Sequence, residues 1–210
     1  IEFILPYEAD HEVDFMKITP AIPQDVTNIK KAGGVYDSHL YTYVDGRKEY
    51  HDIVGQQAIF EDSVGKLVDS REFDVIHAHD WLTFKAAIEA KKVSGKYLVV
   101  HIHATEFDRT GNGSINSAVY NIEREGMEKS DRVIAVSNFT KNTILRHYGV
   151  RSDKVSVVYN AIDSDEYALD PKARVFKENF SKVVLYVGRL TLQKGPDYFI
   201  SAAKRVLDFD

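Results

Sequence analysis

The chain has 210 residues and a formal net charge of −5, and its 44% hydrophobic and 28% charged residues exclude general disorder. The mild acidity argues against a nucleic acid as the main partner, and the absence of cysteine excludes disulfides and fits a reducing compartment. No apolar run reaches the roughly 18 residues that span a membrane, which leaves a cytoplasmic protein that is an enzyme or part of one.

Short apolar runs alternate with helical patterns along the chain. A strand is expected over Ile1–Leu5, and residues 7–45 are predicted to be a long irregular insertion. Five further strands are expected, over Asp74–His79, Lys96–His103, Arg132–Val136, Lys154–Tyr159 and Val183–Val187. Several are nearly continuous Val, Ile and Leu runs, which is typical of strands buried on both faces of a parallel sheet.

Helices are predicted between these strands from apolar residues at helical spacing. Residues 115–126 carry one such stripe, and the next helix begins at an N-cap, Ser137, and stops at Gly149. A third helix begins at Pro196, and its predicted core stripe is Phe199, Ile200, Ala203, Val206 and Leu207. Alternating strands and helices with short links predict an α/β fold with a doubly wound parallel sheet.

The chain is predicted to contain one large domain and the beginning of a second. Residues 163–182 are charged and weakly periodic, and a new apolar run starts at Val183. The predicted domains are therefore residues 1–180 and 181–210. Because the chain starts inside a strand and stops at a helix, we expect it to be a fragment.

Polar side chains gather where the predicted strands end. In an open parallel sheet, ligands bind beyond the carboxyl ends of the strands, so these side chains are the candidates for a site. They are His79, Asp80, His103, Glu106, Arg109, Ser137, Asn160, Arg189 and Lys194.

Two His-x-His pairs allow a metal interpretation. On a strand, residues i and i+2 share a face, so His77 with His79, or His101 with His103, could bind one ion, as in a metal-dependent hydrolase. Against this, His77 and His101 lie inside their strands, where packed histidines are commoner, and no carboxylate stands at a matching position. We therefore predict that the chain holds no metal.

Arg189 and Lys194 are the sharper candidates. They lie on one loop between a predicted strand and a predicted helix, with Gly188 and Gly195 on either side. Arg offers bidentate hydrogen bonds, Lys a point charge, and the helix end unpaired N–H groups, which together suit a diphosphate. The alternative is a pair of solvated surface cations, just as Ser137 has an alternative interpretation as an N-cap alone.

Five strings, taken together and in order, resemble a known family. They are DVIHAHDW (residues 74–81), HATE (103–106), DRVIAVS (131–137), VYNAID (158–163) and GRLTLQKG (188–195). As a set they resemble glycogen and starch synthases and other retaining glycosyltransferases of the GT-B fold and family 4 type.

The resemblance implies an enzyme of two Rossmann-like lobes that moves a hexosyl group, with glucosyl favoured, from ADP- or UDP-sugar to a glycan acceptor such as an α-glucan. It implies catalytic roles for His103, Arg189 and Lys194, and no metal or cofactor. The implied donor-binding residues are Arg189, Lys194, Ser137 and Asn160, and the implied acceptor-side residues are His79, Asp80, Glu106 and Arg109.

Three departures from the family pattern bear on activity. The family's first strand with its Gly-Gly loop and its Glu-x7-Glu element are not found, and Ala161 stands where glycine is usual. The chain alone is therefore expected to be inactive. A non-catalytic lobe that binds a glycan or a nucleotide stays open as a further alternative.

Overall fold

The structure, a computed structural model, describes residues 1–7, 13–21, 40–44, 47–51, 53–111, 113–164 and 183–209. Its strands are β1 (Glu2–Leu5), β2 (Lys17–Pro20), β3 (Leu40–Val44), β4 (Arg47–His51), β5 (Val75–His79), β6 (Tyr97–Ile102), β7 (Arg132–Ala135) and β8 (Val155–Val157). Its α-helices are α1 (Ile53–Val68), α2 (Trp81–Ser94), α3 (Glu106–Arg109), α4 (Ser117–Lys129), α5 (Asn138–His147) and α6 (Pro196–Leu207). None of these described helices is both long and apolar enough to cross a membrane.

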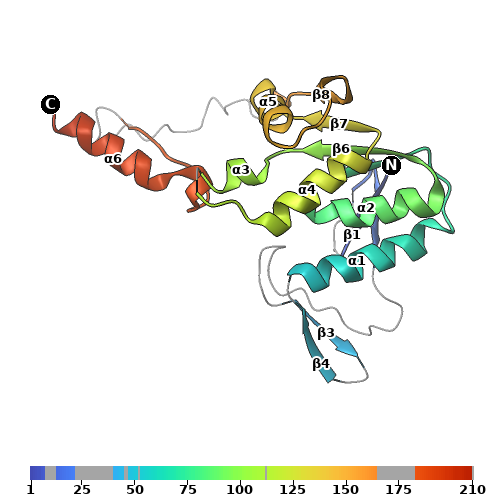
Figure 1. The fold of residues 1–210 in the computed structure, drawn as a ribbon. Helices are drawn as coiled ribbons and strands as arrows, with labels where there is room; N and C mark the ends of the chain where they lie inside the picture. Colours follow the sequence, from blue (N-terminus) through green and yellow to red (C-terminus); the bar gives the residue numbers. More distant parts are fainter. Residues whose placement is uncertain are drawn as a thin grey trace.

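Strands β5 to β8 form a four-stranded parallel sheet whose order in space follows the order in the chain. Helix α2 joins β5 to β6, α3 and α4 join β6 to β7, and α5 lies between β7 and β8 (Figure 1). The predicted strands are present here, each shortened by one or two residues at one end or at both. The predicted α/β fold class, with a parallel Rossmann-like sheet, is confirmed.

The main core lies between one face of this sheet and helices α2, α4 and α5. On β6, Leu98, Val100 and Ile102 alternate with outward residues and are at most 1% exposed. They pack with Phe84 of α2 and Met127 of α4, among other buried residues. Because the crossovers all run in one direction along the sheet, their helices fall on the same side.

The other face of β5 is exposed, whereas the sequence predicted strands that are buried on both faces. Val75 is 50% exposed, and His77 and His79 on the same face are exposed as well. Among the described residues, helices cover the opposite face alone, where Ala78 is buried. This open face of β5 and β6 carries the histidines of the candidate site.

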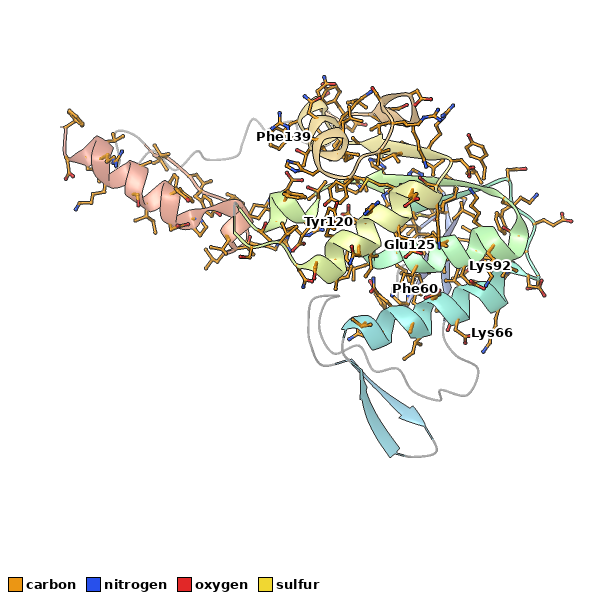
Figure 2. The ribbon with its side chains drawn as sticks, in the orientation of Figure 1. Phe60, Lys66, Lys92, Tyr120, Glu125 and Phe139 are labelled. Atoms are coloured by element: carbon orange, nitrogen blue, oxygen red, sulfur yellow. The ribbon has the colours of Figure 1, made fainter. Side chains whose placement is uncertain are left out.

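Helix α1 adds a second apolar layer by packing on α2. Phe60, labelled in Figure 2, and Val64 and Val68 are buried with Ala86 and Ala90 of α2. Alanines on the α2 side let the two helix backbones approach each other. Helix α2 is therefore enclosed between α1 and the sheet.

Gly126 determines how closely α4 packs on α2. A Cβ atom added at Gly126 would lie 2.3 Å from Cδ2 of Phe84, whose side chain is fully buried. In a helix interior, Gly→Ala is ordinarily stabilising by about 1 kcal/mol. Here we expect Gly126→Ala to destabilise the protein by about 1–3 kcal/mol, because the ring or the helix must move. Thermal unfolding followed by circular dichroism measures the fall in Tm.

The matched control is Gly65→Ala in α1. A Cβ atom at Gly65 would meet Cγ of Glu89 at 3.1 Å, and this side chain, which reaches the surface to pair with Lys92, can move aside. We expect the Tm of Gly65→Ala to equal or exceed that of the unsubstituted protein. A Gly126→Ala protein that melts no lower than the Gly65→Ala protein would show that the Phe84 contact is not limiting.

The segment after residue 183 differs from its prediction. Residues 183–187 form no strand, and the prediction of a strand over Val183–Val187 is wrong. A parallel strand needs a neighbour for its backbone N–H and C=O groups, and no described strand lies beside this segment.

Helix α6 is present with Pro196 in its first turn, as predicted. Its predicted core stripe is not buried among the described residues, since Val206 and Leu207 are exposed, and Figure 1 shows α6 extending away from the sheet.

Two small sheets lie outside the main sheet. β1, which was predicted, pairs in parallel with β2, and β3 forms an antiparallel hairpin with β4. The irregular insertion predicted over residues 7–45 is wrong where that region is described, since β2 and β3 lie there. An ion pair of 3.3 Å from Lys17 to Glu2 joins β2 to β1, a polar contact that apolar periodicity does not reveal. Residues 22–39 and the predicted domain boundary at residue 180 lie outside the described residues.

Candidate functional site

Strands β5 and β6 deliver four histidines to one edge of the sheet. In their parallel register His79 lies opposite His101, and His77 lies two residues before His79 on the same strand face. His103 follows directly after β6. We call His77, His79, His101 and His103 the histidine cluster.

The rings of the histidine cluster stack on one another. Ring centroids are 4.5 Å apart for His77 and His79, 4.4 Å for His101 and His103, and 5.1 Å for His79 and His101. Nδ1 of His79 and Nε2 of His103 are 3.0 Å apart, a hydrogen bond in which one ring donates and the other accepts. Both ring nitrogens of His101 are buried and have no hydrogen-bond partner among the described residues.

Three rings of the histidine cluster, those of His77, His79 and His101, have lowered pKa values. Burial, reinforced by the neighbouring rings, lowers the pKa of His101 to about 4. Burial is also the largest cause that lowers the pKa of His77 and of His79. A neutral imidazole keeps one nitrogen lone pair, which can accept a hydrogen bond or bind a metal.

Asp80 turns the chain from β5 into α2 with a strained backbone. Its φ of 57° and ψ of 168° lie in a region that glycine adopts easily and other residues rarely, and such strain tends to cluster at functional sites. The amide of Asp80 donates to the carbonyl of His101 at 3.0 Å, and Oδ1 of Asp80 accepts from the amide of His103 at 2.8 Å. Asp80 thus joins the ends of the two strands and positions His103.

Two substitutions at Asp80 test its hydrogen bond to the amide of His103. Asp80→Ala removes the acceptor for the His103 amide and leaves alanine at a positive φ, so we expect a loss of about 1–3 kcal/mol of stability. Asp80→Asn keeps an acceptor oxygen on a side chain of the same shape, so most of the stability should remain. Urea unfolding measures both; equal losses for the two variants would contradict the assigned hydrogen bond.

Glu106 and Arg109 of α3 belong to a buried ion-pair network. Nε of Arg109 donates to Glu106 at 3.3 Å, Nη1 donates to the carbonyl of Ala104 at 2.7 Å, and Nη2 donates to Glu123 of α4. Glu123 also accepts from the amide of Glu106 at 3.0 Å and from the Tyr148 hydroxyl. These bonds hold α3 against α4 and the end of α5.

This network sets one guanidinium against two carboxylates, and burial raises the pKa of Glu123. Burial alone would lower the pKa of Arg109, but the carboxylates of Glu123 and Glu106 outweigh it and raise that pKa above its ordinary value. Burial also raises the pKa of Tyr148, so its hydroxyl stays protonated and can donate. Glu106 and Arg109 therefore point inward to each other and to Glu123, and they shape the loop after His103.

Sequence reasoning missed Glu123 and Tyr148. One signal was present: Glu123 stands four residues after Val119 and three before Gly126, on the buried stripe of α4. A carboxylate at such a position needs a charged or hydrogen-bonding partner. That requirement pointed to a buried pair without identifying Arg109 as the partner.

Ser137 and Asn160 follow β7 and β8. Ser137 is the N-cap of α5, as one interpretation predicted, and its Oγ accepts from the amide of Thr140 at 3.0 Å. Its neighbour Asn138 donates to the Tyr159 hydroxyl at 2.8 Å, which ties the start of α5 to the chain after β8. Asn160 lies exposed one residue further on. Ser137 and Asn160 thus follow the carboxyl ends of their strands at the same edge of the parallel sheet as His79 and His103.

Arg189 and Lys194 are exposed on the segment that leads into α6. The hydroxyl of Tyr186 donates to the carbonyl of Lys194 at 3.2 Å, which closes this loop, and Gly195 turns into the helix at φ 57°. The carbonyl of Leu192 comes within 3.6 Å of a Cβ added at Gly111, so the loop lies beside the chain that follows α3. The described contacts do not bring Arg189 or Lys194 to the histidine cluster.

Several known proteins are similar to this chain over most of its length. A glycosyltransferase of Methanocaldococcus jannaschii, described as uncharacterized, is 28% identical over 94% of this chain and 52% of its own length. The UDP-Gal:alpha-D-GlcNAc-diphosphoundecaprenol alpha-1,3-galactosyltransferase of Escherichia coli is 30% identical over 70% of this chain and 40% of its own length. The glycogen synthase of Mycobacterium tuberculosis is 27% identical over 89% of this chain and 46% of its own length.

The chain spans about half the length of these curated relatives. Their names support a transferase and give no support to the metal-dependent hydrolase hypothesis. Residues 8–166 match the pattern of Glycosyltransferase Family 4, a span that includes β5 to β8 and the histidine cluster. The chain belongs to glycosyltransferase family 4.

Proposed function

We propose that this chain is the acceptor-side part of a retaining glycosyltransferase that moves a hexosyl group, with glucosyl favoured, from ADP- or UDP-sugar to a glycan, with an α-glucan favoured. Family membership and the likeness to a glycogen synthase support this proposal. The observation that carries it is the exposed His103, held by Asp80 and His79 at the carboxyl edge of the sheet.

Each predicted site residue has a place in the proposed reaction. His103 contacts the transferred sugar, with His79 and Asp80 beside it on the acceptor side. Glu106 and Arg109 act on that side through the loop that they position. Ser137 and Asn160 face the donor along the same edge, where the start of α5 supplies unpaired N–H groups.

Arg189 and Lys194 bind the diphosphate of the donor in this proposal. Charge builds up on the leaving diphosphate as the sugar bond breaks, and fixed cations stabilise it at that moment. Two cations and a helix N-terminus supply this stabilisation, so the proposed transfer uses no metal and no cofactor.

The test measures release of ADP or UDP from ADP-glucose, UDP-glucose and UDP-galactose, with glycogen as acceptor. It is run on the 210-residue chain and on the complete gene product. Turnover by the complete product, with the new linkage in the α configuration, supports the proposal, and the chain alone is expected to be inactive. Saturable nucleotide-sugar binding without turnover in either protein would instead indicate a non-catalytic binding lobe.

His103 gives a direct check of the proposed sugar contact. His103→Ala in the complete gene product should lower kcat/KM by about 10- to 100-fold, the value of one hydrogen bond to a charged or charge-developing group. His147→Ala is the control for loss of an exposed imidazole, because His147 stacks on Phe107 of α3 and no described contact joins it to the histidine cluster. Equal activity of the two variants would show that His103 has no role in the reaction.

A further inference from the structure

The histidine cluster contains more imidazole than the proposed sugar contact uses. That contact involves His103 and its partner His79, whereas His77 and His101 have no part in it. Nitrogen atoms of His77, His79 and His101 nevertheless lie within 4.8 Å of one another. They come from two adjacent strands of one sheet, which hold them on a rigid support.

Three imidazole nitrogens are ligands that d-block cations prefer. Neutral imidazole suits zinc, copper and nickel, whereas magnesium and calcium prefer oxygen ligands. His101 in addition has both ring nitrogens buried without a partner among the described residues, and a bound ion would satisfy one of them.

The sequence alone predicted no metal, but the structure brings these nitrogens together, and we propose that His77, His79 and His101 bind one divalent d-block cation, of which Zn²⁺ is the probe of choice. Tetrahedral zinc with bonds of about 2.0–2.1 Å needs ligand nitrogens about 3.3 Å apart, so the rings must close by about 1.5 Å or less. The three rings lie at 11–34° to one another, so His77 and His79 must also turn to aim a nitrogen lone pair at the ion that His101 binds. Both side chains are exposed and have room to turn. The fourth position is left for water.

His103 supports the site from outside it. A histidine that binds a metal with one nitrogen usually donates a hydrogen bond from the other. The 3.0 Å bond between Nδ1 of His79 and Nε2 of His103 supplies this partner when His79 is the donor. Metal binding thus selects the form of His79 that carries its proton on Nδ1 and leaves Nε2 free for the ion.

The test uses the 210-residue chain freed of metal with a chelator, and titrates it with Zn²⁺ by calorimetry. We expect one ion per chain, and a rise in Tm of about 5–10 °C at a hundredfold excess over Kd. Mg²⁺ is expected to leave the Tm unchanged. The site does not depend on the proposed glycosyl transfer, so these results stand whether or not the enzyme turns over.

Variants identify the ligands. His77→Ala and His101→Ala should each weaken Zn²⁺ binding by at least 100-fold, and His103→Ala by about 10- to 100-fold as a supporting partner. His147→Ala, the matched surface histidine, should bind as the unsubstituted chain does. His77 is exposed, so its variant tests the site even if His101→Ala fails to fold. No binding below millimolar Zn²⁺, or equal binding by the His77→Ala and His147→Ala proteins, would overturn the proposal.

Discussion

Arg189→Ala or Lys194→Ala is expected to slow glycosyl transfer by the complete gene product by about 100- to 1,000-fold each. Both cations lie on the segment just before the start of α6, where the unpaired N–H groups of the helix add positive potential. Removing one donor aimed at developing negative charge typically costs this much in kcat. The effect should fall on kcat more than on KM, because the charge on the diphosphate grows as the bond breaks.

The control for this pair lies on the same helix. Lys204 and Arg205 are exposed in the last turn of α6, far from its N-terminus. Lys204→Ala and Arg205→Ala remove the same charges and should leave turnover within about twofold. A change below about threefold for Arg189→Ala and Lys194→Ala would reduce the two residues to surface cations, the alternative interpretation of their loop.

Glu123→Ala is expected to destabilise the protein more than Gly126→Ala or Asp80→Ala does, with a loss of about 3–5 kcal/mol. The Glu123 side chain is 2% exposed and bonds Arg109, Tyr148 and the amide of Glu106. Its removal leaves the Arg109 guanidinium buried with Glu106 as its remaining carboxylate partner among the described residues. The Tm should fall by about 6–20 °C in thermal unfolding.

Glu125→Ala is the matched control in the same helix. Glu125, labelled in Figure 2, pairs with Lys129 one turn along, and both side chains are largely exposed to solvent. Such a pair contributes about 0.5 kcal/mol or less, so its Tm should barely change. Tyr148→Phe removes one hydroxyl from the network and should cost about 1–2 kcal/mol. Similar losses of stability for Glu123→Ala and Glu125→Ala would mean that burial does not strengthen the ion pair between Glu123 and Arg109.

Much of the sheet could be predicted because its strands are local patterns. The runs that became β5 to β8 are apolar enough to be recognised without their neighbours, and Ser137 and Gly149 mark the start and the stop of α5 in the sequence. The run at residues 183–187 is equally apolar and therefore also predicts a strand. It forms no strand because pairing depends on a neighbour, which a local pattern does not describe.

The candidate site was predictable as a set of positions and not as a set of contacts. The rule for the carboxyl ends of parallel strands led to His79, Asp80 and His103, which the structure brings together. The same rule named Glu106 and Arg109 without showing that they face inward. Their partner Glu123 comes from another helix, and only tertiary packing places it there.

The order β5, β6, β7, β8 within the sheet has a consequence for how the protein is made. Each strand pairs with the one synthesised just before it, across one crossover, so no strand must wait for a distant part of the chain. Paired residues are 22 to 33 positions apart in the sequence, so each pairing closes only one crossover, and domains fold from the N-terminal side during synthesis. This sheet can grow by one edge at a time during translation, and its newest edge remains the docking place for whichever strand emerges next.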